Sequence, residues 1–250
     1  MNPHLTYPFR AIGKLWQGAT ATGTGSLIGP RHVLTAAHNV ADGGGIYGWE
    51  VVFKPGQNGT GTAPLGSYSE AGCGGGCGIY VGIYNNTLRD YAVIGMPNSS
   101  ALAAIGWFAM ANYSDECAYD SVTTYLKGYP AASQDCGIYQ TGCAGYQWSH
   151  TNTTNRCAQF DGSYGMLYYR NDTTNGQSGS AVYRYISDVP AILAVHKRDN
   201  LTGACSNCEY TANPANQNVG ALLRPAVYND ICFWMSEVGE SSYAYHPCAD

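Results

Sequence analysis

Short runs of apolar and β-branched residues, bounded by Gly, Pro and Asn, recur along nearly the whole chain. Such runs predict strands, because these side chains fit a pleated surface and the turn residues end it. Six predicted strands occupy the first half, at 11–16, 24–28, 32–36, 49–53, 79–84 and 91–95. Six more follow the turn-rich stretch 112–120, at 122–127, 146–150, 165–169, 181–185, 192–195 and 219–223. The pattern predicts an all-β fold of two six-stranded antiparallel β-barrels.

The last part of the chain changes its period. Val227, Ile231 and Trp234 fall at i, i+4 and i+7, and Pro225 is tolerated in a first helical turn. We therefore expect one C-terminal α-helix over 225–237, packed on the second barrel. The organisation that follows is an N-terminal barrel at 1–115 and a C-terminal barrel at 116–250 that ends in the helix.

The amino-acid composition limits which partners the protein can bind. Only 12% of the 250 residues are charged, whereas Gly reaches 32 and Tyr 21, as in proteins of many short strands and tight turns. The net charge of −5 offers no basic surface for phosphates, so we expect no nucleic-acid partner. No apolar run approaches the roughly 20 residues of a membrane-spanning helix, so we expect no membrane partner. We also expect a monomer.

Cysteines and asparagines indicate the compartment. The ten cysteines form an even set, as a disulfide framework in an oxidising compartment requires, and we expect a secreted protein. Proximity along the chain suggests bridges 73–77, 205–208 and 232–248, and leaves the other four cysteines unassigned. The two close pairs could also suggest zinc, but an extracellular setting favours disulfides, so we expect no metal and no cofactor. Seven Asn-x-Ser/Thr sites predict a glycoprotein, at Asn58, Asn85, Asn98, Asn112, Asn152, Asn171 and Asn200.

Three separated strings carry the chemistry. His38 ends the apolar run 33–37, Asp90 precedes the apolar run 91–94, and Ser178 lies in Gly-Gln-Ser-Gly-Ser. A serine hydroxyl becomes a useful nucleophile when an imidazole takes its proton and a buried carboxylate orients that imidazole. The glycines at 176 and 179 allow a tight turn that would aim the amides of Gly176 and Ser178 at an oxyanion. The sequence therefore predicts a His38, Asp90 and Ser178 triad.

The chain order His, Asp, Ser and the string around Ser178 distinguish between hydrolase classes. Lipases and esterases carry Gly-x-Ser-x-Gly and a different order of the three residues. The chain resembles the chymotrypsin-type serine proteases, and more closely the bacterial glutamyl endopeptidases of the staphylococcal V8 and Bacillus kind. The resemblance extends over nearly the whole chain, through the segments 7–12, 23–30, 128–130, 147–150, 176–180 and 193–196.

This resemblance implies a substrate preference. In that family a histidine on the strand after the nucleophile, with a Thr or Ser five residues before the nucleophile, binds the substrate's glutamate carboxylate. The matching positions are His196 and Thr173. Protein or peptide substrates cleaved after Glu, or Asp, are what the resemblance implies.

The chain departs from the trypsin-like pattern at two positions. Gln177 stands where trypsin-type zymogens have the Asp that captures a freed N-terminus, and Asn39 stands where the cysteine after the histidine is usual. Activation through a buried N-terminal ion pair is therefore not expected. Two alternatives stay open: a protease of this fold with another specificity, and a non-catalytic homologue that binds partners through its surface.

Overall fold

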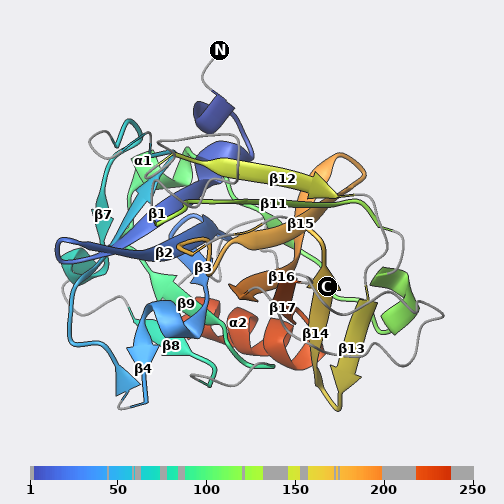
Figure 1. Ribbon diagram of the computed structural model, residues 1–250. Coiled ribbons are helices and arrows are strands. Elements are labelled where there is room, and N and C mark those ends of the chain that lie inside the picture. Colours follow the sequence, from blue (N-terminus) through green and yellow to red (C-terminus); the bar gives the residue numbers. More distant parts are fainter. Residues whose placement is uncertain are drawn as a thin grey trace.

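Two antiparallel β-sheets and a C-terminal helix form the molecule in this computed structural model (Figure 1). The structure describes residues 3–43, 45–57, 59, 63–73, 78–83, 88–119, 122–131, 146–152, 157–171, 173, 175–198 and 218–237. The first sheet contains, in spatial order, β7 (Tyr68–Ser69), β6 (Val51–Pro55), β1 (Ile12–Gln17), β2 (Thr20–Leu27), β3 (His32–Thr35), β9 (Ala92–Gly95) and β8 (Ile79–Val81).

The second sheet follows the same antiparallel plan. Its order is β12 (Trp148–Asn152), β11 (Thr124–Gly128), β15 (Ala181–Ile186), β16 (Val189–Arg198), β17 (Asn218–Leu222), β14 (Tyr164–Tyr169) and β13 (Cys157–Asp161). The short β10 (Ala109–Met110) pairs with β16 in parallel, and β4 (Ala41–Asp42) pairs with β5 (Gly45–Ile46) apart from both sheets. The helical segments are α1 (Ser100–Ala103), α2 (Pro225–Glu237), and the 3₁₀ turns η1 (Pro3–Leu5), η2 (Phe9–Ala11), η3 (Ala37–Asn39), η4 (Glu70–Cys73) and η5 (Glu116–Tyr119).

The prediction of an all-β protein with two antiparallel sheets and a C-terminal helix is confirmed. The count of six strands in each sheet is wrong: among the described residues the sheets have seven and eight strands. Each of the twelve predicted runs contains a strand, and the added strands are mostly two-residue pairings, too short for a period-2 pattern to reveal. The boundary between 115 and 116 stays a prediction.

One apolar core joins the two sheets. Leu15, Val33 and Val93 of the first sheet belong to the same buried cluster as Tyr183 and Ile192 of the second. A smaller cluster lies within the second sheet, around Leu126, Leu167 and Leu222. Because the sheets share a core, polar side chains near their junction are brought out of water together.

The helix α2 packs differently from our expectation. Val227, Ile231 and Met235 are buried along one face, as their spacing predicts, and the bounds of the helix are confirmed. However, Trp234 stacks on Tyr80 and Tyr91 of the first sheet's β8–β9 region, with 5.7 Å between ring centroids in both pairs. Contacts with β9 and β14 place the helix between the two sheets (Figure 1). The expected packing on the second barrel holds for β14 but is incomplete, because the Trp234 indole stacks on side chains of the first sheet.

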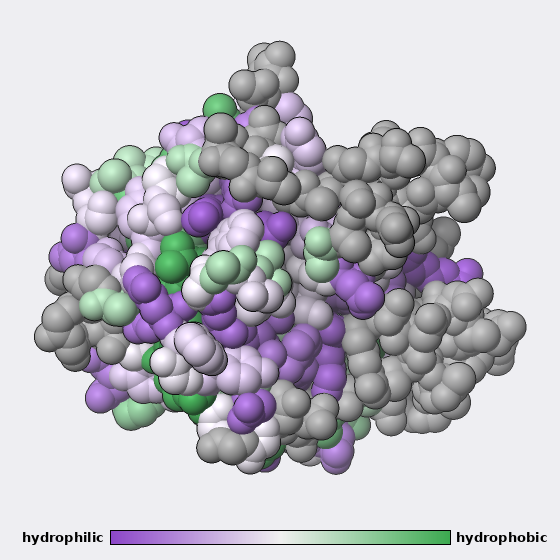
Figure 2. Space-filling view, turned by 60° about the vertical axis from the view of Figure 1, so that its left-hand side comes forward, coloured by the Kyte–Doolittle hydropathy of each residue, from purple (hydrophilic) through white to green (hydrophobic). Residues whose placement is uncertain are grey.

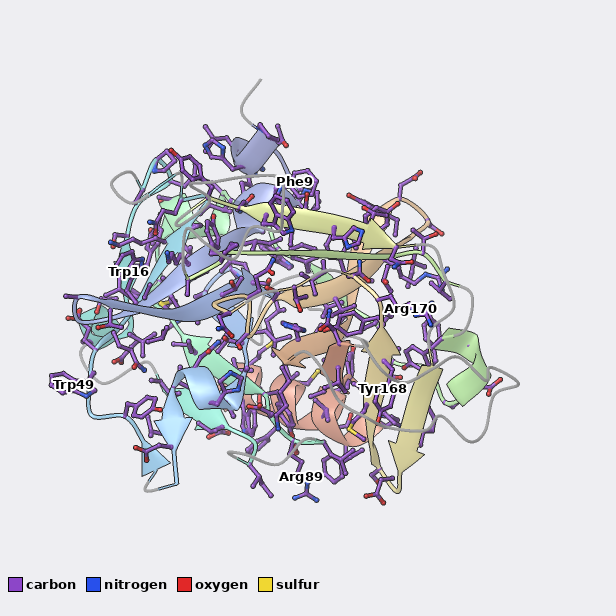
Figure 3. All side chains as sticks on the ribbon, viewed as in Figure 1. Phe9, Trp16, Trp49, Arg89, Tyr168 and Arg170 are labelled. Atoms are coloured by element: carbon purple, nitrogen blue, oxygen red, sulfur yellow. The ribbon has the colours of Figure 1, made fainter. Side chains whose placement is uncertain are left out.

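Over the described residues in Figure 2, hydrophilic and intermediate residues predominate, with small scattered apolar patches. Trp49 is the most exposed large apolar side chain of the described part, at 69%, and Figure 3 shows it at the edge of the molecule. None of the described helices is long and apolar enough to cross a membrane.

The predicted disulfides fall largely outside the described residues. Cys232 of α2 is disulfide-bonded, but its predicted partner Cys248 is not described. Of the predicted bridge 73–77 only Cys73 is described, and of the predicted bridge 205–208 neither cysteine is.

Candidate active site

His38 and Asp90 meet beside the first sheet. His38 lies in η3, directly after β3, and Asp90 lies two residues before β9, the neighbour of β3. The His38 backbone amide donates to Asp90 Oδ1 at 3.0 Å, and the His38 Nδ1 atom is 2.8 Å from Asp90 Oδ2. Asp90 is fully buried, whereas the His38 side chain is 30% exposed. The imidazole thus has one edge on a buried carboxylate and the other toward solvent.

The ionisation of Asp90 fixes the tautomer of His38. Burial alone would raise the pKa of Asp90, but the hydrogen bonds from His38 and the charges of His38 and Lys197 outweigh it and lower the pKa. An ionised carboxylate only accepts hydrogen bonds, so Nδ1 of His38 carries the proton that it donates. The lone pair of neutral His38 is therefore on Nε2, where a general base needs it.

Asn39 ties this pair to the loop of Ser178. Its Nδ2 donates to Ser178 O at 2.8 Å and to Thr35 Oγ1 at 2.9 Å, and the Ser178 carbonyl also accepts from the amide of Thr24 at 2.9 Å. Asn39 is 2% exposed, so these hydrogen bonds are shielded from water. Asn39 stands where trypsin-like chains usually have a disulfide-bonded cysteine. In this chain it links the first sheet to the Ser178 loop through hydrogen bonds instead.

Two glycines give the Ser178 loop its shape. Gly176 and Gly179 have φ values of +89° and +84°, a region that residues with a Cβ rarely adopt. A Cβ on Gly176 would lie 2.3 Å from Ala131 N, and one on Gly179 would lie 2.2 Å from Thr24 O. Both positions therefore require glycine for conformation and for space. Within the described part of the chain, the amides of Gly176 and Ser178 donate to no protein group.

The hydroxyl of Ser178 is hydrogen-bonded elsewhere than to the imidazole in the described structure. Ser178 Oγ donates to the backbone carbonyl of Lys197 at 3.2 Å, and the described residues show no hydrogen bond between it and His38. The three predicted triad residues are brought to one place, but only the His38–Asp90 pair is joined by a side-chain hydrogen bond.

His196 lies in β16 of the second sheet, beside this loop, and Thr173 lies five residues before Ser178. The backbone of His196 pairs with the Ser178 loop on both sides: its carbonyl accepts from the amide of Gly179, and its amide donates to Ser180 O, both at 2.8 Å. The His196 side chain is 2% exposed, and its Nδ1 contacts the hydroxyl of the fully buried Tyr169. Thr173 Oγ1 is buried and has no hydrogen-bond partner among the described residues.

Burial sets the protonation of these groups. Desolvation, with a smaller effect from the positive charge of His38, lowers the pKa of His196 to about 3. Burial also raises the pKa of Tyr169 well above its ordinary value. At neutral pH both are therefore uncharged, and the Tyr169 hydroxyl keeps its proton.

Asn39, Tyr169 and Lys197 were missed as contributors to this region. Asn39 was noted only for what it replaces, although its position beside His38 was a usable signal. Nothing in a single sequence indicates which core tyrosine reaches His196, because that depends on the register of β14 against β17 and of β17 against β16.

One predicted glycan site is corrected: Asn171 is fully buried, and its side-chain amide is hydrogen-bonded to Thr124 and to His150 O. Exposed Asn98 remains a prediction.

Two known proteins match most of this chain in sequence. The chain is 28% identical over 232 residues to glutamyl endopeptidase of Bacillus licheniformis, covering 91% of this chain and 64% of that protein. It is 27% identical over 246 residues to a Bacillus subtilis protein named extracellular metalloprotease, covering 93% and 66%. The chain therefore spans about two thirds of the length of these relatives. No family model matches it. Within the described residues, no group of three His, Cys, Asp or Glu could hold a metal ion.

Solved structures show the fold. A Glu endopeptidase in complex with MPD matches with a TM-score of 0.66 at 21% identity, covering 93% of this chain and 94% of that one. The protease Anisep from Arthrobacter nicotinovorans matches with a TM-score of 0.65 at 18% identity, covering 91% and 96%. The thermostable serine protease AL20 matches with 0.62 at 16% identity, covering 88% and 94%. The chain has the fold of the chymotrypsin-type serine proteases and is related to bacterial glutamyl endopeptidase.

Proposed function

We propose that this chain is a secreted serine endopeptidase that cleaves protein or peptide substrates. The observation that carries the proposal is the hydrogen bond between His38 and the buried Asp90, together with that of Asn39, the residue after His38, to the carbonyl of Ser178. That arrangement places a general base, His38, whose tautomer is fixed by Asp90, next to the Ser178 loop, whose conformation requires two glycines. The name of the extracellular relative and the cysteine content support secretion.

In the proposed reaction, Ser178 Oγ attacks the scissile carbonyl while its proton passes to His38 Nε2. The new oxyanion accepts hydrogen bonds from the amides of Gly176 and Ser178. His38 then gives its proton to the leaving amine as the C–N bond breaks, which leaves an acyl-enzyme. Water, deprotonated by His38, hydrolyses the ester, and Asp90 stabilises the imidazolium in both halves.

The serine must first change its partner. We expect rotation about the Ser178 Cα–Cβ bond to move the hydroxyl from the Lys197 carbonyl toward His38 as substrate binds. Catalytic hydrogen bonds are often long or misaligned without substrate, so the resting contact at 3.2 Å is compatible with the proposal.

For specificity we infer a preference for Glu, or Asp, at the residue whose carbonyl is attacked. Tyr169 keeps its proton and donates it to His196 Nδ1, so neutral His196 carries its own proton on Nε2. That N–H and the Thr173 hydroxyl, which has no partner among the described residues, are two donors suited to a carboxylate. The name of the Bacillus licheniformis relative supports the same preference.

A panel of peptides that differ only in Glu, Asp, Gln or Leu at the cleaved residue tests the proposal. The wild-type chain should cleave after Glu and Asp most efficiently, with the isosteric Gln peptide as the control for charge. Ser178→Ala should lower turnover by on the order of 10⁶-fold, with its fold checked by circular dichroism.

The outcomes separate the alternatives. Cleavage that is lost in Ser178→Ala but favours another residue would retain the protease and reject the Glu preference. Undiminished cleavage by a clean Ser178→Ala preparation would reject the mechanism. A folded wild-type chain that cleaves no member of a broad peptide library would indicate the non-catalytic homologue.

A further inference from the structure

A buried lysine contacts the carboxylate of the candidate triad. Lys197 Nζ lies 3.5 Å from Asp90 Oδ2, the same oxygen that accepts from His38 Nδ1. The Lys197 side chain is 6% exposed and Asp90 is fully buried. Neither the predicted triad nor the predicted pocket includes this residue.

An irregularity in β16 directs the Lys197 side chain toward Asp90. In β16, His196 pairs with Gly220 and Arg198 pairs with Val219, so Lys197 is the extra residue of a β-bulge. A bulge breaks the regular alternation of side chains and can redirect one of them. The bulged residue also offers its carbonyl to Ser178 Oγ. One residue of β16 thus contacts the serine through its backbone and the carboxylate through its side chain.

The ammonium has two electrostatic consequences. It stabilises the ionised form of a carboxylate that has been removed from water. It also offsets part of the negative charge that His38 experiences, so it disfavours the imidazolium relative to the neutral imidazole. A base that resists protonation remains usable at lower pH.

The other charged and titratable groups around the pair are differently engaged. Tyr91 donates to Asp230 Oδ2 of α2 at 2.5 Å, and the Arg89 guanidinium stacks over the Tyr164 ring at 3.8 Å, at the lower edge of the view in Figure 3. Asp42 of β4 is exposed, and His196 is neutral at working pH. Among the described residues, the other charged and titratable groups of this region are Asp42, Arg89, Tyr91, Tyr164, His196 and Asp230.

We propose that Lys197 is a positioning residue of the triad, which holds the Asp90 carboxylate in place and extends the activity of His38 toward acidic pH. The inference rests on the proposed serine protease function. It predicts that removal of the charge makes protonation of His38 easier. The acidic limb of kcat/KM should therefore move to higher pH.

The test measures His38 protonation and activity separately. Histidine ring NMR, with signals assigned by a His38→Gln variant, follows His38 through a pH titration in a Ser178→Ala background, which needs no catalysis. Lys197→Met should raise the titration midpoint by roughly 0.5–1.5 pH units, and the acidic limb of kcat/KM in the Ser178 protein should move by a similar amount. Lys197→Arg, which keeps the charge, should leave both in place. Lys54→Met, which removes a charge from β6, is the matched control.

Each result has a defined meaning. A midpoint that stays in place or falls in Lys197→Met overturns the inference, even if kcat/KM drops uniformly, because a uniform drop indicates packing alone. Lys197→Gln replaces Lys197→Met if the latter does not fold. A raised midpoint in a chain that hydrolyses no peptide would support the role of Lys197 and reject the protease function.

Discussion

The two halves of the candidate site differ in how their buried polar groups are satisfied. On the first sheet, buried Asp90 accepts two hydrogen bonds from His38 and lies against the Lys197 ammonium. Near the second sheet, Thr173 Oγ1 is buried and has no hydrogen-bond partner among the described residues, and the imidazole of His196 is held neutral by burial. Buried polar groups are normally paired, so the first half is complete in the resting protein. In the second half, the Thr173 hydroxyl has no partner among the described residues, and we expect a ligand to supply one.

This difference assigns the chemical step and the substrate specificity to separate places. Breaking the paired half should damage chemistry first, because its groups already interact. Changing the unpaired half should alter substrate preference and the pH dependence of folding, because its groups lack counterions.

Asp90→Asn gives the largest effect on the paired half. The amide has one acceptor oxygen and one donor group, so it cannot accept from both the His38 backbone amide and Nδ1–H, and it is no counterion for the imidazolium; His38 therefore loses its fixed tautomer. We expect kcat/KM to fall by roughly 10⁴-fold, measured with the Glu peptide. A loss of less than tenfold, in a protein with unchanged thermal unfolding, would show that Asp90 does not orient the base.

The second half should show a pH-dependent stability caused by His196. Its pKa is about 3 in the folded state and near 6.5 when unfolded, so the unfolded chain binds more protons between these values. The free energy of unfolding should therefore be fully retained above pH 6.5 and fall by roughly 3–5 kcal/mol as the pH drops to 3. Denaturant titrations across this range measure it. His196→Gln should flatten the slope, and an equal slope in both proteins would contradict the assignment.

Asn39→Ala breaks the link between the halves. The substitution leaves the carbonyl of Ser178 with one acceptor bond fewer and removes a bond to Thr35, which should cost about 1–3 kcal/mol of unfolding free energy. We also expect kcat to fall more than KM rises, because the serine loop loses alignment with His38. Asn39→Asp offers the matched control, since it keeps the shape but cannot donate to the carbonyl. An unchanged free energy of unfolding in both variants would contradict the claim that the Asn39 hydrogen bonds link the two halves.

Tyr169→Phe, which should have the smallest effect, tests whether the Tyr169 hydroxyl fixes the tautomer of His196. Without the hydroxyl, His196 Nδ1 has no donor to fix its tautomer, and the proton on Nε2 is no longer enforced. The ratio of kcat/KM for Glu over Gln peptides should fall by about tenfold, while cleavage after Leu stays within a few-fold. A ratio equal to that of wild type would show that Tyr169 supports the core only.

The sequence predicted those features that local pattern determines. Runs of β-branched residues located the twelve strand positions, and the spacing of Val227 and Ile231 located the helix. His38 and Asp90 could be paired because each adjoins a buried strand, and β3 and β9 proved to be neighbours.

Features that depend on long-range packing could not be predicted. The docking of α2 depends on Trp234 finding Tyr80 and Tyr91, some 140 to 150 residues away in the chain. The aim of Lys197 depends on a bulge that appears only when β16 pairs with β17. A strand lysine alone would have been taken for a solvated edge residue.

Labelling with a fluorophosphonate tests the central claim most directly, because this reagent reacts with a serine that a neighbouring base has activated. We predict a single covalent adduct at Ser178 in the wild-type chain, located by peptide mass spectrometry, and its loss in His38→Ala at equal protein stability. Equal labelling in His38→Ala, or none in the folded wild-type chain, would contradict the claim that His38 and Asp90 activate this hydroxyl.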